Sequence, residues 1–460
     1  MKQIKTDLCI IGAGSGGLSV AAGAAQMGAD VVLLEGGKMG GDCLNFGCVP
    51  SKALLAMGKK ARAGQPVSYA QAMDHVKEVI ATIEPHDSQE RFESFGVNVI
   101  REYGHFISPR EVQAGDTIIK ARRFVIATGS SPMVPPIPGL EDVPYLTNES
   151  IWEQDSRPDH LLIIGAGPIG MEMAQAHLRL GSKVTVVDMV RALHRDDPEL
   201  TSYVTKQLQA EGLTLIEGVA ADRVAAGGEG IELHLNNGQT VTGSHLMLAA
   251  GRKPNVGTLN LQTAGIEMNG AFVKVNEQLK TTNRLVYAIG DANGIMQFTH
   301  TAGYHAGVIV RSALFGMSAK ASHAHVPYAT YTQPELAHVG LSEAEAKEKY
   351  GDKAEVAKFD IVGNDRAVAD GINEGLIKVI VVKGRPVGAS IVGTHAGELI
   401  SLWSLAIANK LKMSQISAMV APYPTYAEIN KRAAGAYFTP RLFDNPSVKR
   451  IVRWVQRLVP

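Results

Sequence analysis

Two cysteines lie five positions apart in the segment GGDCLNFGCVPSK, Cys43 and Cys48. Thiols this close can cycle between a dithiol and a disulfide. In a regular helix, however, residues five apart are separated by about 7.5 Å along the axis, beyond the roughly 7 Å Cα limit for a disulfide. Asn45 and Gly47 allow an irregular turn between them that would bring the sulfurs together. The close spacing therefore favours a redox-active pair joined by such a turn.

The residues after Cys48 favour a reactive thiolate. The stretch VPSKALLAM predicts a helix that starts close to Cys48, and Lys52 lies in its first turns. A helix start and a neighbouring cation both lower a thiol pKa. The alternative is that Cys43 and Cys48 are unpaired, buried cysteines. We interpret Cys9, which lies in an apolar strand, as a core residue of this kind. A metal site is disfavoured, because no second cysteine pair or histidine pair stands at zinc spacing.

Two segments, residues 6–37 and 160–189, share a design that must position this chemistry. Each runs from an apolar strand through a Gly-x-Gly-x-x-Gly turn and a small-residue helix to a second strand that ends in an acid, Glu35 or Asp188. This is the βαβ unit that binds a dinucleotide. The first glycine permits the tight turn, and the second lets the pyrophosphate approach the backbone. The third lets the helix and the strand pack closely. The six glycines are Gly12, Gly14 and Gly17 in the first copy and Gly165, Gly167 and Gly170 in the second.

Composition excludes several classes of protein. A chain of 460 residues exceeds what one core usually supports, so we expect two to four domains. Lys plus Arg equals Asp plus Glu, 45 each, which gives no electrostatic reason for a nucleic-acid partner. The sequence shows no signal peptide or membrane span, and three cysteines suit a reducing compartment. We therefore expect a soluble, cytoplasmic protein.

The segment GGDCLNFGCVPSKALL resembles the redox-active segment of the class I pyridine nucleotide–disulfide oxidoreductases, which include dihydrolipoamide dehydrogenase, glutathione reductase and mercuric reductase. The likeness covers almost the whole chain and includes RLVYAIGDA at 284–292 and TQPELAHVGLSEAEA in the C-terminal part. It also includes two alanine–glycine segments, Ala127–Thr128–Gly129 and Ala249–Ala250–Gly251. The resemblance implies an α/β fold with two Rossmann-like dinucleotide-binding domains, for FAD and NAD, and a C-terminal α+β dimerisation domain that makes a homodimer.

We expect five segments along the chain. They are a FAD-binding domain with the redox disulfide at 1–150, an NAD(P)-binding domain at 151–272, a central FAD-binding part at 273–326, a dimerisation domain at 327–440 and a basic amphipathic tail at 441–460. The polar side of the tail carries Lys449, Arg450, Arg453 and Arg457. We favour a docked or solvated helix there over contact with an anionic membrane.

The resemblance also implies roles. Cys48 would lie against the flavin and Cys43 would exchange with substrate, while Lys52 would pair with Glu172 beside the isoalloxazine. The nicotinamide cofactor would be NAD(H) rather than NADP(H), because Asp188 would repel a 2′-phosphate, although Arg191 and Arg195 lie nearby. The FAD site would be formed by Gly12, Gly14, Gly17, Glu35, Lys52, Thr128, Gly129 and Asp291, and the nicotinamide site by Gly165, Gly167, Gly170, Asp188 and Gly251.

The chain departs from the family pattern at one position. Members that reduce disulfides carry His-Pro-Thr followed by a glutamate, and the His serves as the acid–base for thiol exchange. Here the segment is APYPTYAEINKR, with Tyr423 in place of the His and Glu428 as the glutamate. A phenol with a pKa near 10 is a poor base at neutral pH. The segment PYPTYAE resembles that of mercuric reductases, which have a tyrosine at a comparable place. Those enzymes also carry a C-terminal cysteine pair, however, and no cysteine follows Cys48 here.

The first hypothesis is an NADH-dependent FAD disulfide oxidoreductase, similar to dihydrolipoamide dehydrogenase, that passes electrons through Cys43 and Cys48 to a small-molecule or protein-bound disulfide or another acceptor. The second is a mercuric-reductase-like enzyme that reduces a metal ion or other thiophilic acceptor. The third is a redox-sensing or assembly subunit with little turnover, against which the intact cysteine pair and both nucleotide fingerprints weigh.

Overall fold

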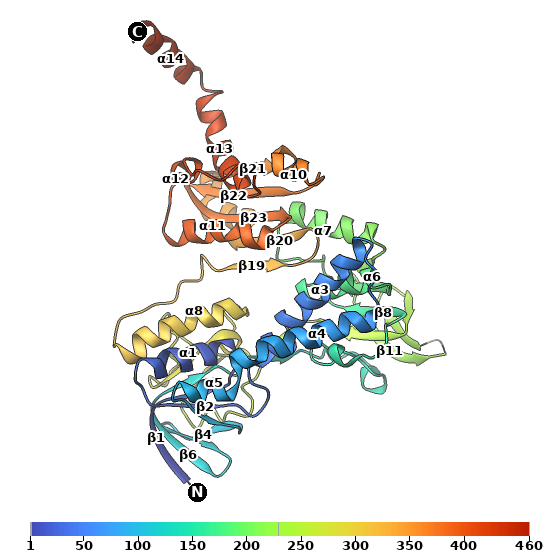
Figure 1. Ribbon diagram of the computed structural model, residues 1–460, viewed down its shortest axis with the longest axis vertical. Helices are drawn as coiled ribbons and strands as arrows, with labels where there is room; N and C mark the ends of the chain where they lie inside the picture. The colour runs from blue at the N-terminus through green and yellow to red at the C-terminus, as the bar shows by residue number, and fades with distance from the viewer. Residues whose placement is uncertain (1, 229, 460) are drawn as a thin grey trace. The chain divides into compact units, whose positions relative to one another are not determined.

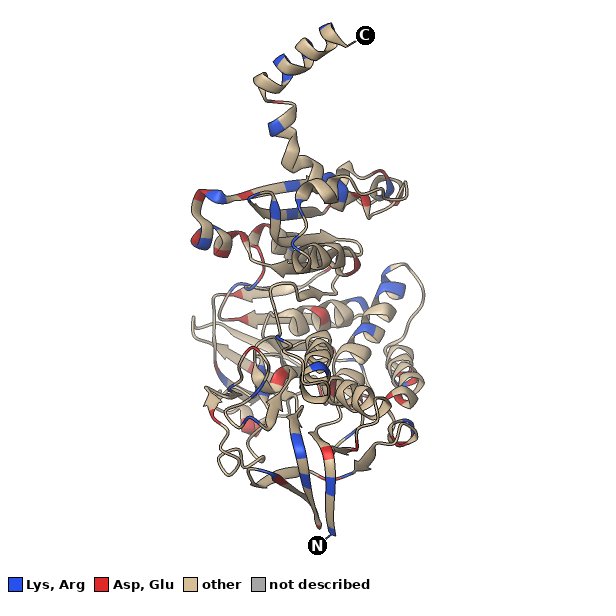
Figure 2. Cartoon of the chain, turned by 90° about the vertical axis from the view of Figure 1, so that its left-hand side faces the viewer, with Lys and Arg blue, Asp and Glu red and all other residues tan. Residues whose placement is uncertain are grey.

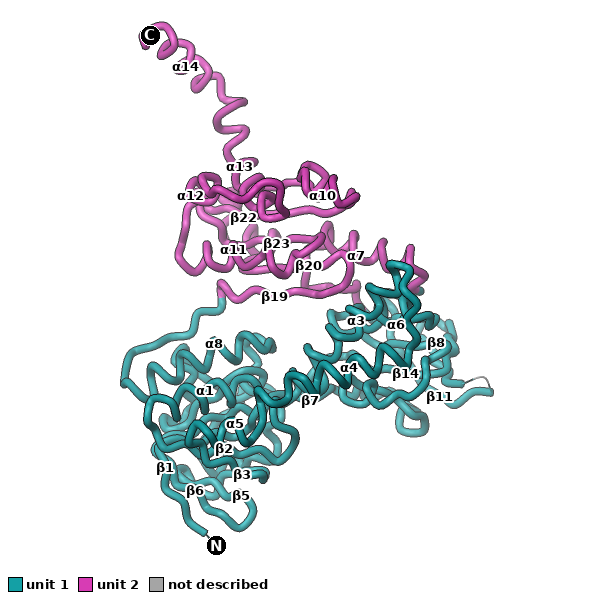
Figure 3. Tube along the Cα trace, viewed as in Figure 1, with its two compact units in different colours: residues 1–189, 214–323 teal, residues 190–213, 324–460 magenta. Residues whose placement is uncertain are grey.

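The computed structural model describes residues 2–228 and 230–459, and the chain divides into two compact units (Figures 1 and 3). Unit 1 comprises residues 1–189 and 214–323, and unit 2 comprises residues 190–213 and 324–460. Unit 1 carries both glycine fingerprints and the cysteine pair. Unit 2 carries Tyr423, and so the two parts of the candidate chemistry belong to different units.

The first glycine fingerprint lies in a parallel sheet. Strands β3, β2, β1, β6 and β18 are hydrogen-bonded in that order and are all parallel, and β6 also pairs with the antiparallel hairpin of β5 and β4. Their apolar runs are buried on both faces, as expected for a parallel sheet covered by helices. The strands are β1 (Lys2–Ile11), β2 (Val31–Leu34), β3 (Asn98–Ile100), β4 (Gly104–Ser108), β5 (Glu111–Ala114), β6 (Thr117–Ile126) and β18 (Val286–Ala288).

The helices of this part of unit 1 position the cysteines. Helix α1 packs against α8, and α3 packs against both α4 and α6. Between β2 and α3, the short helix α2 carries Cys43. The helices are α1 (Ser15–Gln26), α2 (Gly41–Asn45), α3 (Cys48–Arg62), α4 (Tyr69–Ile83), α5 (Gln89–Ser94) and α8 (Thr299–Ile309).

The second fingerprint lies in a four-stranded parallel sheet with the order β10-β9-β8-β14. A three-stranded antiparallel sheet, β11-β12-β13, is inserted in the chain between β10 and β14. The two parallel sheets confirm the predicted pair of Rossmann-like folds. The elements are β8 (His160–Ile164), α6 (Pro168–Arg179), β9 (Lys183–Asp188), β10 (Thr214–Glu217), β11 (Ala221–Gly227), β12 (Gly230–Leu235), β13 (Thr240–Gly243) and β14 (His245–Leu248). A two-stranded pair, β7 (Ser130–Pro132) with β15 (Arg252–Pro254), joins their connecting segments.

Unit 2 is built on a five-stranded antiparallel sheet with the order β19-β20-β23-β22-β21. Its core packs α11 and α13 against the sheet around the fully buried Trp403. The elements are α7 (Pro198–Ala210), β19 (Pro327–Thr330), β20 (Glu335–Gly340), α9 (Glu343–Tyr350), β21 (Ala354–Asp360), α10 (Asp365–Ala369), β22 (Leu376–Val382), β23 (Arg385–Gly393), α11 (Ala396–Ala408), α12 (Met413–Ser417), α13 (Glu428–Leu442) and α14 (Pro446–Leu458).

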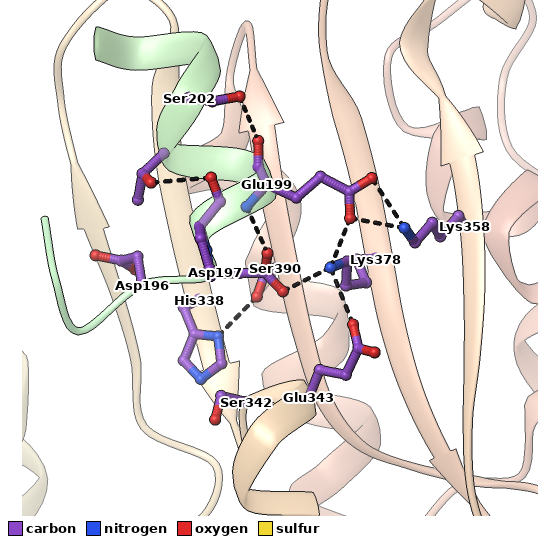
Figure 4. A network of polar contacts seen from close by, with 12 residues as sticks. Asp196, Asp197, Glu199, Ser202, His338, Ser342, Glu343, Lys358, Lys378 and Ser390 are labelled. Atoms are coloured by element: carbon purple, nitrogen blue, oxygen red, sulfur yellow. Dashed lines mark hydrogen bonds and ion pairs between the residues drawn. The ribbon is translucent and has the colours of Figure 1, made fainter. Parts of the chain in front are cut away.

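A buried lysine fastens α7 to this sheet, although α7 precedes the sheet by more than a hundred residues (Figure 4). The Nζ of Lys378 lies 2.6 Å from Asp197, 2.7 Å from Glu199 and 3.0 Å from Glu343, and 4% of its side chain is exposed. Burial lowers the pKa of Lys378, but the three carboxylates outweigh that effect and leave its pKa raised. The cluster explains why residues 190–213 belong with unit 2.

No helix among the described residues is long and apolar enough to cross a membrane.

Candidate active site

The irregular turn that the sequence allows between the cysteines is present. Helix α2 ends at Asn45 and α3 begins at Cys48, so that Phe46 and Gly47 form the irregular turn. A Cβ atom on Gly47 would lie 2.8 Å from Oδ2 of Asp42 and 3.2 Å from its carbonyl oxygen, which leaves room only for glycine. Both thiols are free in this structure, Cys43 partly buried and Cys48 exposed at the N-terminus of α3.

The two thiols differ in acidity. A hydrogen bond with the Cys43 thiol lowers the pKa of Cys48 to about 6, and the Thr299 hydroxyl at 3.5 Å and the cation of Lys52 act in the same direction against burial. The same hydrogen bond, together with burial, raises the pKa of Cys43. At neutral pH the reduced pair therefore holds one proton on Cys43 and a thiolate on Cys48.

The predicted partner of Lys52 is in place. Its Nζ lies 2.8 Å from Oε2 of Glu172, which comes from α6 and is 3% exposed. The pair joins the helix that begins with Cys48 to the helix that follows the second glycine turn. The buried carboxylate is compensated by this cation, as a buried charge must be.

The first glycine turn forms a cradle for an anion. Gly12 has φ +107°, and a Cβ there would lie 2.4 Å from the carbonyl oxygen of Ala127; a Cβ on Gly17 would lie 1.9 Å from that of Gly12. Gly14 caps α1, whose first turn has no side-chain cap and no acid, so its N–H groups are available to a phosphate. Glu35 braces the turn by accepting the Ala13 N–H at 2.7 Å. These residues fit a dinucleotide.

The second turn repeats the first almost atom for atom. Gly165 has φ +113° with its Cβ position 2.3 Å from the Ala249 oxygen, and the Cβ position of Gly170 is 1.9 Å from the Gly165 oxygen. Asp188 accepts the Ala166 N–H at 2.7 Å, as Glu35 does in the first turn. The sequence repeat thus corresponds to two equivalent nucleotide cradles in unit 1.

The remaining predicted cofactor residues lie on the connections between the sheets. Gly129 and Gly251 both have positive φ, at +65° and +116°, on either side of the β7–β15 pair. The Thr128 hydroxyl is buried and has no hydrogen-bond partner among the described residues, so it is free to bind a ligand. Asp291 accepts a short hydrogen bond from the Ser130 hydroxyl, and burial raises its pKa.

Sequence reasoning missed an arginine in this site. The Arg252 guanidinium lies 3.0 Å from Asp42 beside the cysteine pair, donates to the Ser130 hydroxyl at 2.7 Å, and is 3.8 Å from Asp291. It connects the cysteine segment with the Asp291 loop. Its position directly after Gly251 is the one signal that could have found it. Thr299, the hydroxyl beside Cys48, carries no sequence signal.

A cavity of about 370 Å³ opens on Cys43 and on the start of α1. Its lining includes Ser15, Gly40, Cys43 and Thr299. The polar start of α1 and the Cys43 thiol therefore face the same space. A ligand in that space would contact both the helix N-terminus and Cys43.

Tyr423 lies in unit 2 and is 69% exposed. Its hydroxyl donates a hydrogen bond to Oδ2 of Asp365 at 2.8 Å, and this contact raises the pKa of Tyr423. Glu428 begins α13, five residues later. The phenol is thus a neutral hydrogen-bond donor at physiological pH rather than a base.

The chain is similar in sequence to known enzymes along most of its length. Residues 6–306 match the family described as pyridine nucleotide-disulphide oxidoreductase, and residues 326–434 match its dimerisation domain, which supports a homodimer. Mercuric reductase from Staphylococcus aureus is 36% identical over 448 residues, 93% of this chain and 82% of that protein. Dihydrolipoyl dehydrogenase 3 from Haloarcula marismortui is 32% identical over 458 residues, 93% of this chain and 96% of that protein.

Solved structures show the same fold. The Cu(II) complex of the HOCl-induced flavoprotein disulfide reductase RclA from Escherichia coli has a TM-score of 0.86 at 26% identity and covers 94% of this chain and 99% of its own. LpdA from Mycobacterium tuberculosis has a TM-score of 0.87 at 25% identity, over 95% of this chain and all of its own. Sequence and fold therefore agree over nearly the whole length, and the chain belongs to the class I pyridine nucleotide–disulfide oxidoreductases, FAD-dependent enzymes that use NAD(P)H.

Proposed function

We propose that the protein is an NADH-dependent disulfide reductase that delivers electrons through Cys43 and Cys48, with a dihydrolipoamide-type disulfide as its first candidate acceptor. The observation that carries this proposal is the unequal acidity of the pair. Cys48, with a pKa lowered to about 6, is a thiolate at neutral pH, whereas the pKa of Cys43 is raised and keeps its proton. The Cys48 thiolate is the nucleophile that can close the protein disulfide again, whereas Cys43 must lose its proton as it attacks the substrate sulfur.

The residues of the two cradles are suited to the family's two nucleotides. FAD, when bound, supplies the two-electron chemistry that links NADH to the disulfide. The proposed FAD residues are Gly12, Gly14, Gly17, Glu35, Lys52, Thr128, Gly129 and Asp291. The proposed nicotinamide-cofactor residues are Gly165, Gly167, Gly170, Asp188 and Gly251.

NADH is favoured over NADPH by the groups around Asp188. Its carboxylate ends β9, where it would bind a ribose hydroxyl and repel a 2′-phosphate. Arg191, one of the two nearby cations, already donates to Thr201 at 2.6 Å and to the carbonyl oxygen of Asp196 at 2.8 Å. Its guanidinium is therefore occupied by its own loop and does not offset the repulsion.

The proposed reaction consumes one NADH and one proton for each disulfide reduced to two thiols. In the reduced pair, Cys43 bonds to one substrate sulfur, and its proton leaves with the other substrate sulfur as the first thiol. The Cys48 thiolate then attacks Cys43, which restores the protein disulfide and releases the second substrate thiolate to take a proton from water. Lys52 stabilises the thiolate of Cys48, and Glu172 holds the lysine in place.

A second candidate is the reduction of a thiophilic metal ion, and Tyr423 favours it. Reduction of a metal ion held by a dithiol involves no departing substrate sulfur. It therefore requires neither the base nor the proton donor that disulfide exchange uses, and a neutral phenol is compatible with it. Tyr423 is such a phenol, held by Asp365. The similarity to mercuric reductase from Staphylococcus aureus and to the Cu(II) complex of RclA also supports this candidate. No cysteine follows Cys48 to relay the metal.

One comparison tests both candidates. NADH oxidation by the FAD-loaded protein is measured with lipoamide, glutathione disulfide, a quinone, Hg(II) and Cu(II) under the same conditions, and repeated with Cys43→Ser. We expect turnover of a thiol-reactive acceptor that Cys43→Ser abolishes. Equal rates in the two proteins would show that electrons bypass the pair, and no turnover with any acceptor would favour a redox-sensing subunit.

A further inference from the structure

Helix α14, Pro446–Leu458, is a complete helix without tertiary support. The Asn445 side chain caps it by accepting the backbone N–H groups of Ser447 at 2.9 Å and Val448 at 3.4 Å. None of its residues is buried. The helix also lies outside the part of the chain that matches the dimerisation domain, because that match ends at residue 434.

The exposed surface of α14 is divided into two faces. At 100° per residue, its apolar side chains fall within an arc of about 160° and its four cations within an arc of about 100° on the opposite side. Trp454 is 63% exposed, Ile451 61% and Leu458 61%. The apolar face is Val448, Ile451, Val452, Trp454, Val455 and Leu458, and the basic face is Lys449, Arg450, Arg453 and Arg457. Figure 2 shows the helix with basic residues and without acidic ones.

We propose that α14 is a membrane-surface helix that binds bilayers containing anionic lipids. Its apolar face would enter the boundary between headgroups and acyl chains, and its cations would meet lipid phosphates. At 13 residues the helix is about 20 Å long, too short to span a hydrocarbon core, so it would lie parallel to the surface. Trp454, at the border of the two faces, is the residue type that prefers this interface.

Charge decides between a bilayer and other occupants. The whole chain has a formal net charge of zero, whereas α14 carries four cations and no acidic residue, so this helix is a local cationic surface. Nucleic acid would pair with the basic face but would leave the apolar face in water. Pairing with α14 of a second copy would cover the apolar face but would leave the basic face, on the opposite side of the helix, without an anionic partner. An anionic bilayer satisfies both faces.

The test is co-sedimentation of the FAD-loaded protein with vesicles of phosphatidylcholine alone or mixed with phosphatidylglycerol. We expect binding to the mixed vesicles, at least tenfold weaker binding to phosphatidylcholine, and loss of binding as salt rises from about 0.1 M to 1 M, because the Debye length falls from about 10 to 3 Å. Arg450→Glu with Arg453→Glu should weaken binding more than tenfold, since each cation near such a surface contributes about a factor of five.

Matched variants make the result specific. Lys349→Glu with Lys353→Glu changes the net charge equally at exposed sites outside α14 and should bind like the parent. Ile451→Ser with Leu458→Ser should weaken binding, whereas the exposed pair Phe315→Ser with Met317→Ser should not. Retained binding by Arg450→Glu with Arg453→Glu, or equal binding to both kinds of vesicle, would overturn the proposal.

Fluorescence gives an independent readout. Of the three tryptophans, Trp152 and Trp403 are buried and Trp454 is exposed. A blue shift on addition of mixed vesicles should therefore come from Trp454 and should disappear in Trp454→Phe, which should still sediment with the vesicles. Membrane binding would be refuted if the parent showed neither a blue shift nor sedimentation with the vesicles. If, in addition, Ile451→Ser with Leu458→Ser changed the oligomeric state, the apolar face of α14 would be assigned to contact with a second copy.

Discussion

The ammonium of Lys52 and the carboxylate of Glu172 are 2.8 Å apart, although 120 positions separate them in the chain. Glu172 is 3% exposed, whereas 36% of the Lys52 side chain is exposed. The lysine also lowers the pKa of Cys48. The pair therefore links the acidity of the redox thiol to the packing of α3 on α6.

Replacing Lys52 and replacing Glu172 should have different effects on the pKa of Cys48. In the parent, the Cys48 thiolate should disappear as pH falls through about 6. Lys52→Met removes the cation and should raise the Cys48 pKa by up to about one unit. Glu172→Gln keeps the cation and should leave the pKa unchanged or lower it. The rate of Cys48 alkylation against pH in the reduced protein, followed by peptide mass spectrometry, measures this. A midpoint near 9 in the parent would contradict it.

Two glycine substitutions should separate the nucleotide sites without disturbing the fold. A Cβ on Gly167 would meet no protein atom within 4 Å, and one on Gly14 would approach Gly41 at 3.9 Å. Their helix-capping backbones are extended, so alanine fits. Gly14→Ala should weaken FAD retention, and Gly167→Ala should raise the KM for NADH about tenfold or more while FAD stays bound.

Flavin absorbance after gel filtration and steady-state kinetics measure the two effects. Gly165→Ala is the contrasting control, because its Cβ would lie 2.3 Å from the Ala249 oxygen and should destabilise the protein as a whole. If Gly167→Ala released FAD and left the KM for NADH unchanged, the assignment of the two cradles would be reversed.

Replacing Tyr423 should distinguish the two candidate acceptors. Tyr423→His introduces a base with an ordinary pKa near 6.5 and should raise NADH–lipoamide turnover tenfold or more. Tyr423→Phe removes the hydroxyl that Asp365 binds and should lower metal-dependent NADH oxidation if that is the activity. Asp365→Asn tests the hydrogen bond itself. Unchanged rates in all three variants would exclude a role for this side chain.

The buried cation of unit 2 should contribute strongly to stability. Lys378→Met leaves the buried Asp197 without its cation, whereas Glu199 and Glu343 keep Lys358 and Lys347, and it should cost about 3 kcal/mol of unfolding free energy. Lys358→Met breaks a bond of similar length to Glu199, but 45% of the Lys358 side chain is exposed, and it should cost less than about 1 kcal/mol. Denaturant unfolding of both variants gives the comparison, and equal costs would contradict it.

A buried histidine should make the protein less stable in mild acid. His177 on α6 is completely buried and donates through Nδ1 to the Met173 carbonyl, and burial lowers its pKa to about 4. Because the unfolded chain takes up this proton near pH 6.5, the stability is complete above that pH and is lost as pH falls toward 4. His177 should account for about 2 kcal/mol of the loss between pH 7 and 5, and this contribution should be absent in His177→Leu. Unfolding curves at the two pH values test this, with the exposed His86→Leu as control.

The chemistry of this chain could be predicted from its sequence where that chemistry depends on the local backbone conformation. A glycine with φ above +100° between a strand and a helix, or a glycine that breaks a helix between two thiols, is a requirement that a few adjacent residues reveal. The sequence alone therefore determined the two nucleotide turns with Glu35 and Asp188, the paired Cys43 and Cys48, and the absence of a histidine at Tyr423. All of these predictions need only near neighbours.

Tertiary structure alone decided the electrostatics. The pKa of Cys48 is lowered mainly by its hydrogen bond with Cys43, and Thr299, 251 positions away, lowers it further. Arg252 reaches Asp42 from a distant connection. The same is true of α7, which the buried Lys378 holds to a sheet far along the chain. A charge interaction depends on distance and burial, and both arise when remote segments pack together. Residue order constrains neither, so the pattern of motifs determined which groups react and the packing determined how acidic they are.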